Sequence, residues 1–265
     1  MNQLKTIEHK TILIEVCKLN NLFMITDIGV DIAQDDTFIY KASLYSYDQS
    51  VSVTWLSDKP RGELKKGSAV RAGWITKKLF AVGTNIIDTL YPIESITEKE
   101  SLTSIIDPSD IHDMFAYWVL FRVIDSLPFN YREIINKVLL EQDVLQHFLQ
   151  SPYSVDDLFP FLGGNLQMTT ANVVSILSEN GVDNDPFSRE AVLTATILNG
   201  VGNYNRLEFD KNTQCYINND QTNEHNSNKV ASDLIRKAAS NHGFDRAVLN
   251  EVMQAIDELD IVLQN

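Results

Sequence analysis

The chain has 265 residues, of which 44% are hydrophobic and 22% charged, a balance that places it with ordinary globular proteins of one or two domains. No apolar run approaches the roughly 20 residues of a membrane-spanning helix, and the first residues lack a basic segment followed by an apolar one. We therefore expect a cytoplasmic protein with no membrane partner.

The formal net charge of −14 argues against a general affinity for polyanions, because phosphate contacts require clustered Lys and Arg. The charge is uneven, however. Residues 1–100 carry 12 Lys and Arg against 13 Asp and Glu, whereas the rest of the chain carries 10 against 23. The acidity thus belongs to the second part of the chain. Cys17 and Cys215 fall in different predicted domains, which indicates neither a disulfide nor a metal site.

The first part of the chain, from about residue 11 to 93, consists of short β-rich runs separated by turn residues. The predicted strands are Leu22–Ile25, Thr37–Tyr47, Val51–Trp55, Ser68–Ile75 and Leu79–Val82. Five strands in so short a segment fit a five-stranded β-barrel of the OB type, with an SH3-like barrel as the competing interpretation. Alternation along the second strand assigns Phe38, Tyr40, Ala42 and Leu44 to the core, and Ile39, Lys41, Ser43, Tyr45 and Tyr47 to a half-exposed face.

The basic side chains of the barrel cluster in and around its fourth strand. OB-folds bind single strands by stacking bases on aromatic side chains while basic residues follow the phosphates. We therefore predict weak, salt-sensitive binding of single-stranded DNA or RNA, the alternative being a solvated loop and strand edge. The residues assigned to this interface are Lys41, Tyr45, Tyr47, Lys59, Arg61, Lys65, Lys66, Arg71, Trp74, Lys77 and Lys78. A core position is the alternative for Trp74, which follows Gly73, and is expected for Trp55.

Between residues 94 and 110 the strand pattern gives way to charged residues, Ser, Thr and an Asp-Pro pair, so we place a domain linker there. It separates an N-terminal barrel, residues 1–95, from a C-terminal all-α domain, residues 108–265. The first predicted helix of this domain is capped by Ser109 or Asp110 and ends before Pro128. The later predicted helices are 131–149, 165–179, 187–199, 227–241 and 246–263. A polar loop is predicted at 210–226. The expected fold class is α+β in two domains.

The order of these elements and several short sequence segments resemble those of the YhaM-type exoribonucleases, which join an N-terminal OB-fold to a C-terminal HD domain. In the barrel, the similar segments are Leu22–Ile25, Phe38–Tyr47, Val51–Trp55 and Leu64–Ile75. In the helical part, Phe148-Leu-Gln-Ser-Pro, Phe161-Leu-Gly-Gly-Asn-Leu-Gln-Met-Thr and the segment 191–203 are similar to the family's Pro-ended helix, Gly-Gly-Leu-Leu-Glu-His-Thr and Leu-Leu-His-Asp-Ile-Gly-Lys. The resemblance covers nearly the whole chain.

This resemblance implies a metal-dependent phosphohydrolase whose ligands have been lost. Met168 stands where the family has its first His, and Asn199 and Gly200 stand where it has the His-Asp pair. Asn203 replaces the Lys that follows, and Leu158 and Phe159 occupy the place of a His pair. Only His225 falls near a family histidine. A thioether, a neutral amide and a glycine cannot hold a hard divalent cation, so we expect a pseudoenzyme with no catalytic residue, metal or cofactor.

The chain's one His-Asp dipeptide, His112-Asp113, lacks the apolar lead of an HD motif and is expected to begin a helix. The leading hypothesis is an inactive HD homologue that binds single-stranded nucleic acid through its barrel. One alternative is a protein-interaction scaffold, whose acidic helical surface serves a basic partner or self-association. A further alternative is a residual metal-dependent phosphodiesterase that uses His225.

Overall fold

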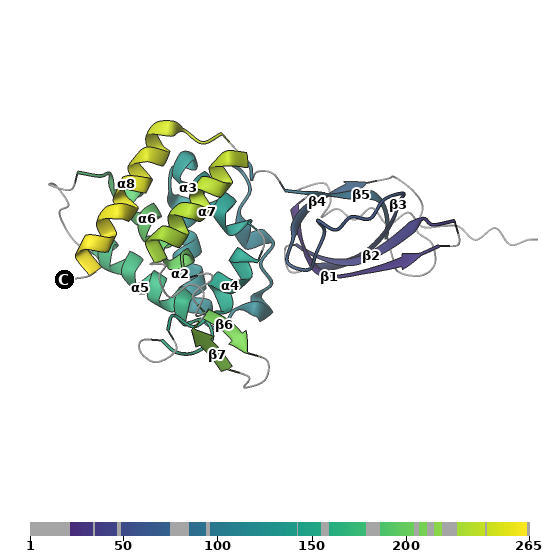
Figure 1. Cartoon of the computed structure of the whole chain (residues 1–265), viewed down its shortest axis with the longest axis horizontal. Helices are drawn as coiled ribbons and strands as arrows, with labels where there is room; N and C mark the ends of the chain where they lie inside the picture. The colour runs from purple at the N-terminus through teal and green to yellow at the C-terminus, as the bar shows by residue number, and fades with distance from the viewer. Residues whose placement is uncertain are drawn as a thin grey trace, which may run out of the picture. The chain divides into compact units, whose positions relative to one another are not determined.

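The computed structural model describes residues 22–33, 35–46, 49–74, 85–93, 96–141, 143–154, 159–178, 186–203, 207–210, 215–218, 227–241 and 243–263. Strands dominate the N-terminal part and helices the C-terminal part (Figure 1), as the sequence predicts. The chain divides into two compact units, one formed by residues 1–93 with 102–107, the other by 94–101 with 108–265. Within the predicted linker, residues 102–107 therefore belong to the first unit, and residues 94–101 and 108–110 to the second.

Five strands of the first unit pair in a ring. They are β1 (Leu22–Ile32), β2 (Phe38–Ser46), β3 (Gln49–Ser57), β4 (Ala69–Trp74) and β5 (Asn85–Pro92). Their order is β1-β2-β3-β5-β4, and β1 also pairs with β4. All of these pairings are antiparallel except that of β3 with β5. The predicted strand Leu79–Val82 lies outside the described residues, and β5 was not predicted.

The core of the barrel follows from the alternation along β2 and β3. Tyr40, Ala42 and Leu44 are buried, and the Tyr40 ring stacks on the buried Trp55 ring, with centroids 5.0 Å apart. Trp55 is therefore a core residue, as predicted. The exposed face predicted for Tyr45 is wrong, because this side chain is only 6% exposed. A bulge in β1 shifts the β1–β2 register next to this point, and both faces of β2 are buried from Leu44 to Ser46.

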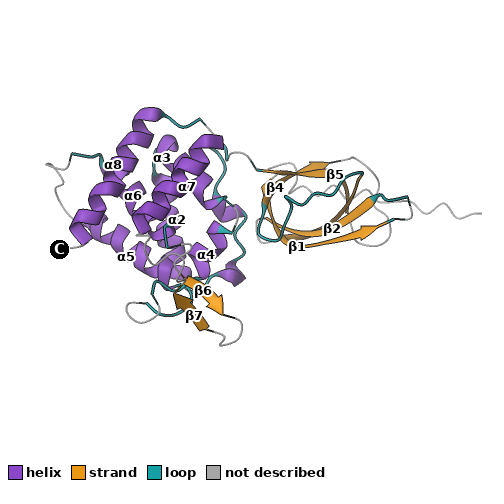
Figure 2. Ribbon diagram, viewed as in Figure 1, coloured by secondary structure: helices purple, strands orange, loops and turns teal. Residues whose placement is uncertain are grey.

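The second unit contains seven α-helices and a β-hairpin among its described residues (Figure 2). The helices are α2 (Met114–Ser126), α3 (Phe129–Leu139), α4 (Val144–Gln150), α5 (Gly164–Ser178), α6 (Arg189–Val201), α7 (Ser227–Asn241) and α8 (Arg246–Leu263). Helix α6 contacts α3, α5, α7 and α8 and is buried along most of its length, so it forms the centre of the unit.

Two details of the helical unit differ from the prediction. The helix predicted over 131–149 is split into α3 and α4, because Asp143 adopts a left-handed conformation with φ 64° between them. The predicted polar loop contains a hairpin of β6 (Leu207–Asp210) and β7 (Cys215–Asn218), so the domain is not all-α. No helix in the described part of the chain is both long and apolar enough to cross a membrane.

The helix ends are fixed by side chains from neighbouring elements. Asp113, not Ser109 or Asp110, caps α2 by accepting a hydrogen bond from the Ala116 N–H at 2.9 Å. Residues 108–110 instead form a short 3₁₀ turn. Ser188 caps α6, and its own N–H donates to Glu251 of α8 at 2.8 Å, which lowers the pKa of the Glu251 carboxyl.

Candidate functional site

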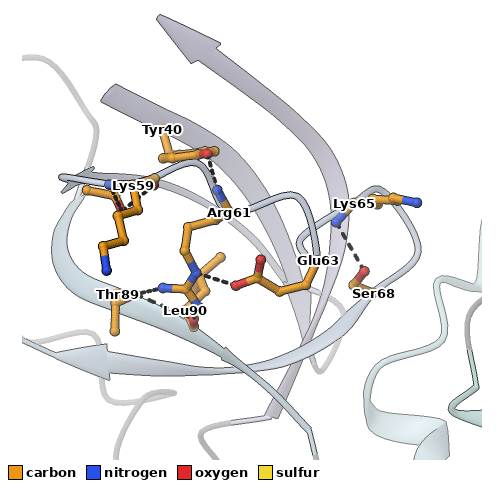
Figure 3. A network of polar contacts seen from close by, with 9 residues as sticks. Tyr40, Lys59, Arg61, Glu63, Lys65, Ser68, Thr89 and Leu90 are labelled. Atoms are coloured by element: carbon orange, nitrogen blue, oxygen red, sulfur yellow. Dashed lines mark hydrogen bonds and ion pairs between the residues drawn. The ribbon is translucent and has the colours of Figure 1, made fainter. Parts of the chain in front are cut away.

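The loop between β3 and β4 carries four of the cations predicted to contact phosphates, and Arg61 lies at its centre (Figure 3). Its backbone N–H donates to the Tyr40 hydroxyl at 2.6 Å, which ties the loop to the end of the barrel core. Its guanidinium donates to the Thr89 hydroxyl at 2.9 Å and to the Leu90 carbonyl at 3.0 Å, both on β5. The same group pairs with Glu63 and lowers the pKa of that carboxyl.

These contacts change the role assigned to Arg61. Its side chain is 24% exposed, and its guanidinium donors are directed at protein acceptors on β5 and in its own loop. An arginine held in this way positions the loop, and phosphate binding would have to break the contacts that place it. We therefore assign Arg61 to the support of the loop and not to the interface itself.

The three lysines of this loop, Lys59, Lys65 and Lys66, are exposed. Lys65 begins a four-residue turn in which its carbonyl accepts from the Ser68 N–H at 3.0 Å, with Gly67 at φ 83° as the third residue. Backbone hydrogen bonds of 2.8 and 2.9 Å hold this turn to Ile25 of β1. Figure 3 shows the Lys65 side chain extending away from the Arg61 network. The loop thus presents ammonium groups on a backbone fixed to the barrel.

The open face of β1, β2 and β3 does not form the aromatic platform that the sequence predicted. Lys41 is exposed there, but its ammonium group pairs with Asp31 at 2.8 Å. The other outward positions of β2 and β3 from Ile39 to Leu56, apart from Tyr45, are not aromatic: they are Ile39, Ser43, Ser50, Ser52, Thr54 and Leu56. Tyr45 is buried, so it offers no ring for a base.

The remaining predicted interface residues are only partly located. Tyr47, Lys77 and Lys78 lie outside the described residues, as does the side chain of Trp74. Arg71 is half-buried on β4 and lies opposite Tyr91 of β5 in the strand register. Tyr91 is 50% exposed, which makes it an aromatic candidate that the sequence analysis missed. The buried residues Ile87 and Leu90 are three apart, because the β4–β5 register shifts between them, so strand alternation provided no signal for this strand in the sequence.

In the helical unit, Asn199 and Gly200 lie at the end of α6, where a buried amide network joins α6 to α5. The Asn165 side-chain amide donates to the Gly200 carbonyl at 3.0 Å. The Asn203 amide in turn donates to the Asn165 side-chain oxygen at 3.0 Å. Asn165 is completely buried and Asn203 is 3% exposed, so this is a buried polar connection. The sequence analysis marked Asn203 as a departure but did not single out Asn165.

The packing at Gly200 leaves no room for a side chain. A Cβ atom at this position would lie 2.9 Å from Cγ2 and 3.0 Å from Cβ of Thr169, and closer still to the Thr169 hydroxyl oxygen. That hydroxyl donates to the Asn165 carbonyl at 2.8 Å, which fixes it in place. At Gly202, a Cβ would meet the Ser227 carbonyl oxygen in the same way. A side chain at position 200, such as the Asp of an HD site, therefore cannot be accommodated unless the Thr169 side chain shifts.

The other positions at which the resemblance predicts lost ligands add no metal-binding donor among the described residues. The Asn199 amide donates to Asn228 and to the Ser227 hydroxyl, so it holds the start of α7. Met168 is half-buried on α5, and His225 lies outside the described residues. Where the chain is described, no three His, Cys, Asp or Glu side chains gather in a way that could hold a metal ion. His112-Asp113 begins α2, as predicted, with Asp113 as the cap.

Comparison of the chain with protein-family models, with curated proteins and with solved structures gives no significant match.

Proposed function

We propose that this protein is a non-catalytic binding protein, built from an OB-type barrel and a degenerate HD-like helical unit. The pairing of β1 with both β2 and β4, and of β3 with β5, supports the OB-type assignment. The resemblance of the chain to the YhaM-type exoribonucleases supports the HD-like assignment. A cytoplasmic location remains a prediction from the sequence.

The observation that carries the absence of catalysis is the contact between Gly200 and Thr169. A hydrolytic metal centre needs several hard donors directed at one point, where they bind the cation that activates water. Here the position of the central aspartate is a glycine pressed against α5, and its neighbour Asn199 is engaged with α7. The junction is filled by hydrogen bonds between amides, hydroxyls and backbone groups, which stabilise the unit without a cation.

For the barrel, the geometry favours contact with the phosphates of a single strand through Lys59, Lys65 and Lys66. The loop that carries these lysines is held in place by Arg61 and by β1, so little loop entropy is lost on binding. The open sheet face offers no aromatic ring in its described part, so base stacking contributes little there. We therefore propose weak binding that is independent of sequence and falls steeply with salt.

The test is a fluorescence anisotropy titration of the full chain with a labelled thymidine strand of about 20 nucleotides at low salt. We expect the triple variant Lys59→Glu, Lys65→Glu, Lys66→Glu to lose affinity by at least about 10-fold. For three phosphate contacts, the wild-type slope of log affinity against log salt should be about −2.

A control variant with the same change in net charge is Lys229→Glu, Arg236→Glu, Arg246→Glu, which alters exposed cations of α7 and α8. It should lose no more than about 2-fold in affinity, because its charges lie in the other unit. Equal losses in both triple variants, or no binding by the wild type at low salt, would exclude the barrel as a nucleic-acid site.

The second candidate function is a protein-interaction scaffold, and one observation favours it. Two aromatic side chains of α2, Phe115 and Trp118, are 78% and 54% exposed. Large exposed aromatic residues in a compact unit mark surfaces that contact another protein.

A further inference from the structure

We infer that Tyr91 of β5 is a base-stacking residue, on which one base of a bound single strand lies while neighbouring phosphates contact the lysines of the loop between β3 and β4. The inference rests on the proposed nucleic-acid function and deepens it, because it names the residue that contacts a base. It concerns the outer side of β4 and β5, a different part of the barrel surface from the open face of β1, β2 and β3.

The Tyr91 side chain lies on the outer side of the barrel. Leu90, the preceding residue, is completely buried in the barrel core, so Thr89 and Tyr91 are directed to the opposite side of β5. Tyr91 is 50% exposed, and among the described residues of the barrel it is the one exposed aromatic side chain. A ring in this position is accessible to a base of any identity, because every base has a π-face on which it can stack.

The lysine-bearing loop is tied to β5 at the residues directly before Tyr91. Arg61 of this loop donates to the Thr89 hydroxyl at 2.9 Å and to the Leu90 carbonyl at 3.0 Å, as Figure 3 shows. Thr89 and Tyr91 lie on the same side of the strand, about 7 Å apart along it. Because Lys59 is two residues from Arg61, a strand whose phosphates contact this loop can place an adjacent base on the Tyr91 ring.

Arg71 of β4 adds a cation to the same side of the barrel. Its neighbours Val70 and Ala72 are both buried in the barrel core, so Arg71 is directed outward. It pairs with Tyr91 in the register of β4 and β5, and residues paired in this way have Cβ atoms about 5 Å apart. An aromatic ring beside a guanidinium matches a nucleotide, which combines a planar base with an anionic phosphate. Arg71 and Thr89 beside the ring are polar, which favours a nucleotide over an apolar protein surface.

The experiment compares two labelled strands of about 20 units in the anisotropy titration, a thymidine strand and a strand of abasic deoxyribose phosphates. Tyr91→Leu keeps an apolar side chain but removes the ring. We expect it to weaken binding of the thymidine strand by about 10-fold and to leave binding of the abasic strand unchanged to within about 2-fold. Tyr91→Phe, which retains the ring, should bind both strands as the wild type does. The control is Ile32→Ala, which alters a 65% exposed apolar side chain of β1 and should change neither affinity.

The two strands separate this inference from the proposed function. If Tyr91→Leu binds the thymidine strand as tightly as the wild type does, the inference is overturned, while phosphate binding by the lysines stands. An equal loss on both strands would also overturn it, because a stacking residue contributes nothing to the binding of an abasic strand. If the wild type binds neither strand at low salt, the proposed function fails and the inference fails with it.

Discussion

The substitution Gly200→Ala is expected to lower the free energy of unfolding of the helical unit by about 3 kcal/mol, although it adds a single methyl group. The new Cβ would overlap the Thr169 side chain, which is fixed by its hydrogen bond to the Asn165 carbonyl. Relief requires either the Thr169 side chain to rotate, which breaks its hydrogen bond to Asn165, or α5 and α6 to separate, which strains the hydrogen bond from Asn165 to the Gly200 carbonyl. Urea denaturation followed by circular dichroism measures the loss.

The control is Gly243→Ala, because a Cβ at Gly243 would meet no atom within 4 Å. It should leave the stability unchanged to within about 0.5 kcal/mol. The double variant Gly200→Ala, Thr169→Ala should recover part of the loss, since alanine at 169 removes the hydroxyl and the methyl group that collide. A Gly200→Ala variant as stable as Gly243→Ala would show that the junction is loosely packed.

The substitution Asn165→Asp is expected to destabilise the unit by about 3 kcal/mol at neutral pH, although it exchanges a single amide nitrogen for oxygen. The ionised carboxylate would still accept from Asn203, but it would lose the hydrogen bond to the Gly200 carbonyl and face that oxygen with a negative charge. Because the side chain is completely buried, burial should raise the pKa of the new carboxyl above its unfolded value.

The sign of the pH dependence follows from that shift. With a folded-state pKa above the unfolded value, the folded variant binds more protons, so its stability relative to wild type rises as the pH falls. Below both pKa values the carboxyl is neutral in both states and can donate to Gly200, so most of the penalty disappears. Denaturation at several pH values tests this, with Asn250→Asp on the exposed side of α8 as the control. A penalty independent of pH would contradict the buried network.

The sequence predicted which barrel residues are buried where burial follows the alternation along a single strand. It did not predict burial where this depends on the pairing with another strand. Tyr40 and Leu44 follow the period of a strand with one buried face. Tyr45 does not, because the register shift in β1 lies in the partner strand and leaves no mark in the sequence of β2. The role of Arg61 was also hidden, since its acceptors Thr89 and Leu90 lie nearly 30 residues further along the chain.

The helical unit shows the same division. The spacing of apolar residues predicted most of the helices. It also predicted one continuous helix through Asp143, where the left-handed conformation of this residue ends one helix and begins another without a proline or glycine. The short strands β6 and β7 lie in a polar segment whose composition favours a loop. For the candidate site, the statement that Asn199 and Gly200 stand in place of metal ligands stays a prediction from the resemblance. That Thr169 fills the space beside Gly200 is visible only in the packing of α5 on α6.

The most direct test of the central claim, that the helical unit has no metal centre, is elemental analysis of the full chain. The protein would be incubated with manganese, iron, zinc and magnesium salts, passed through a desalting column and measured by mass spectrometry. The account predicts less than about 0.1 divalent cation per chain and no cation-dependent rise in melting temperature. Retention of one or two cations per chain, lost in His225→Ala, would contradict it.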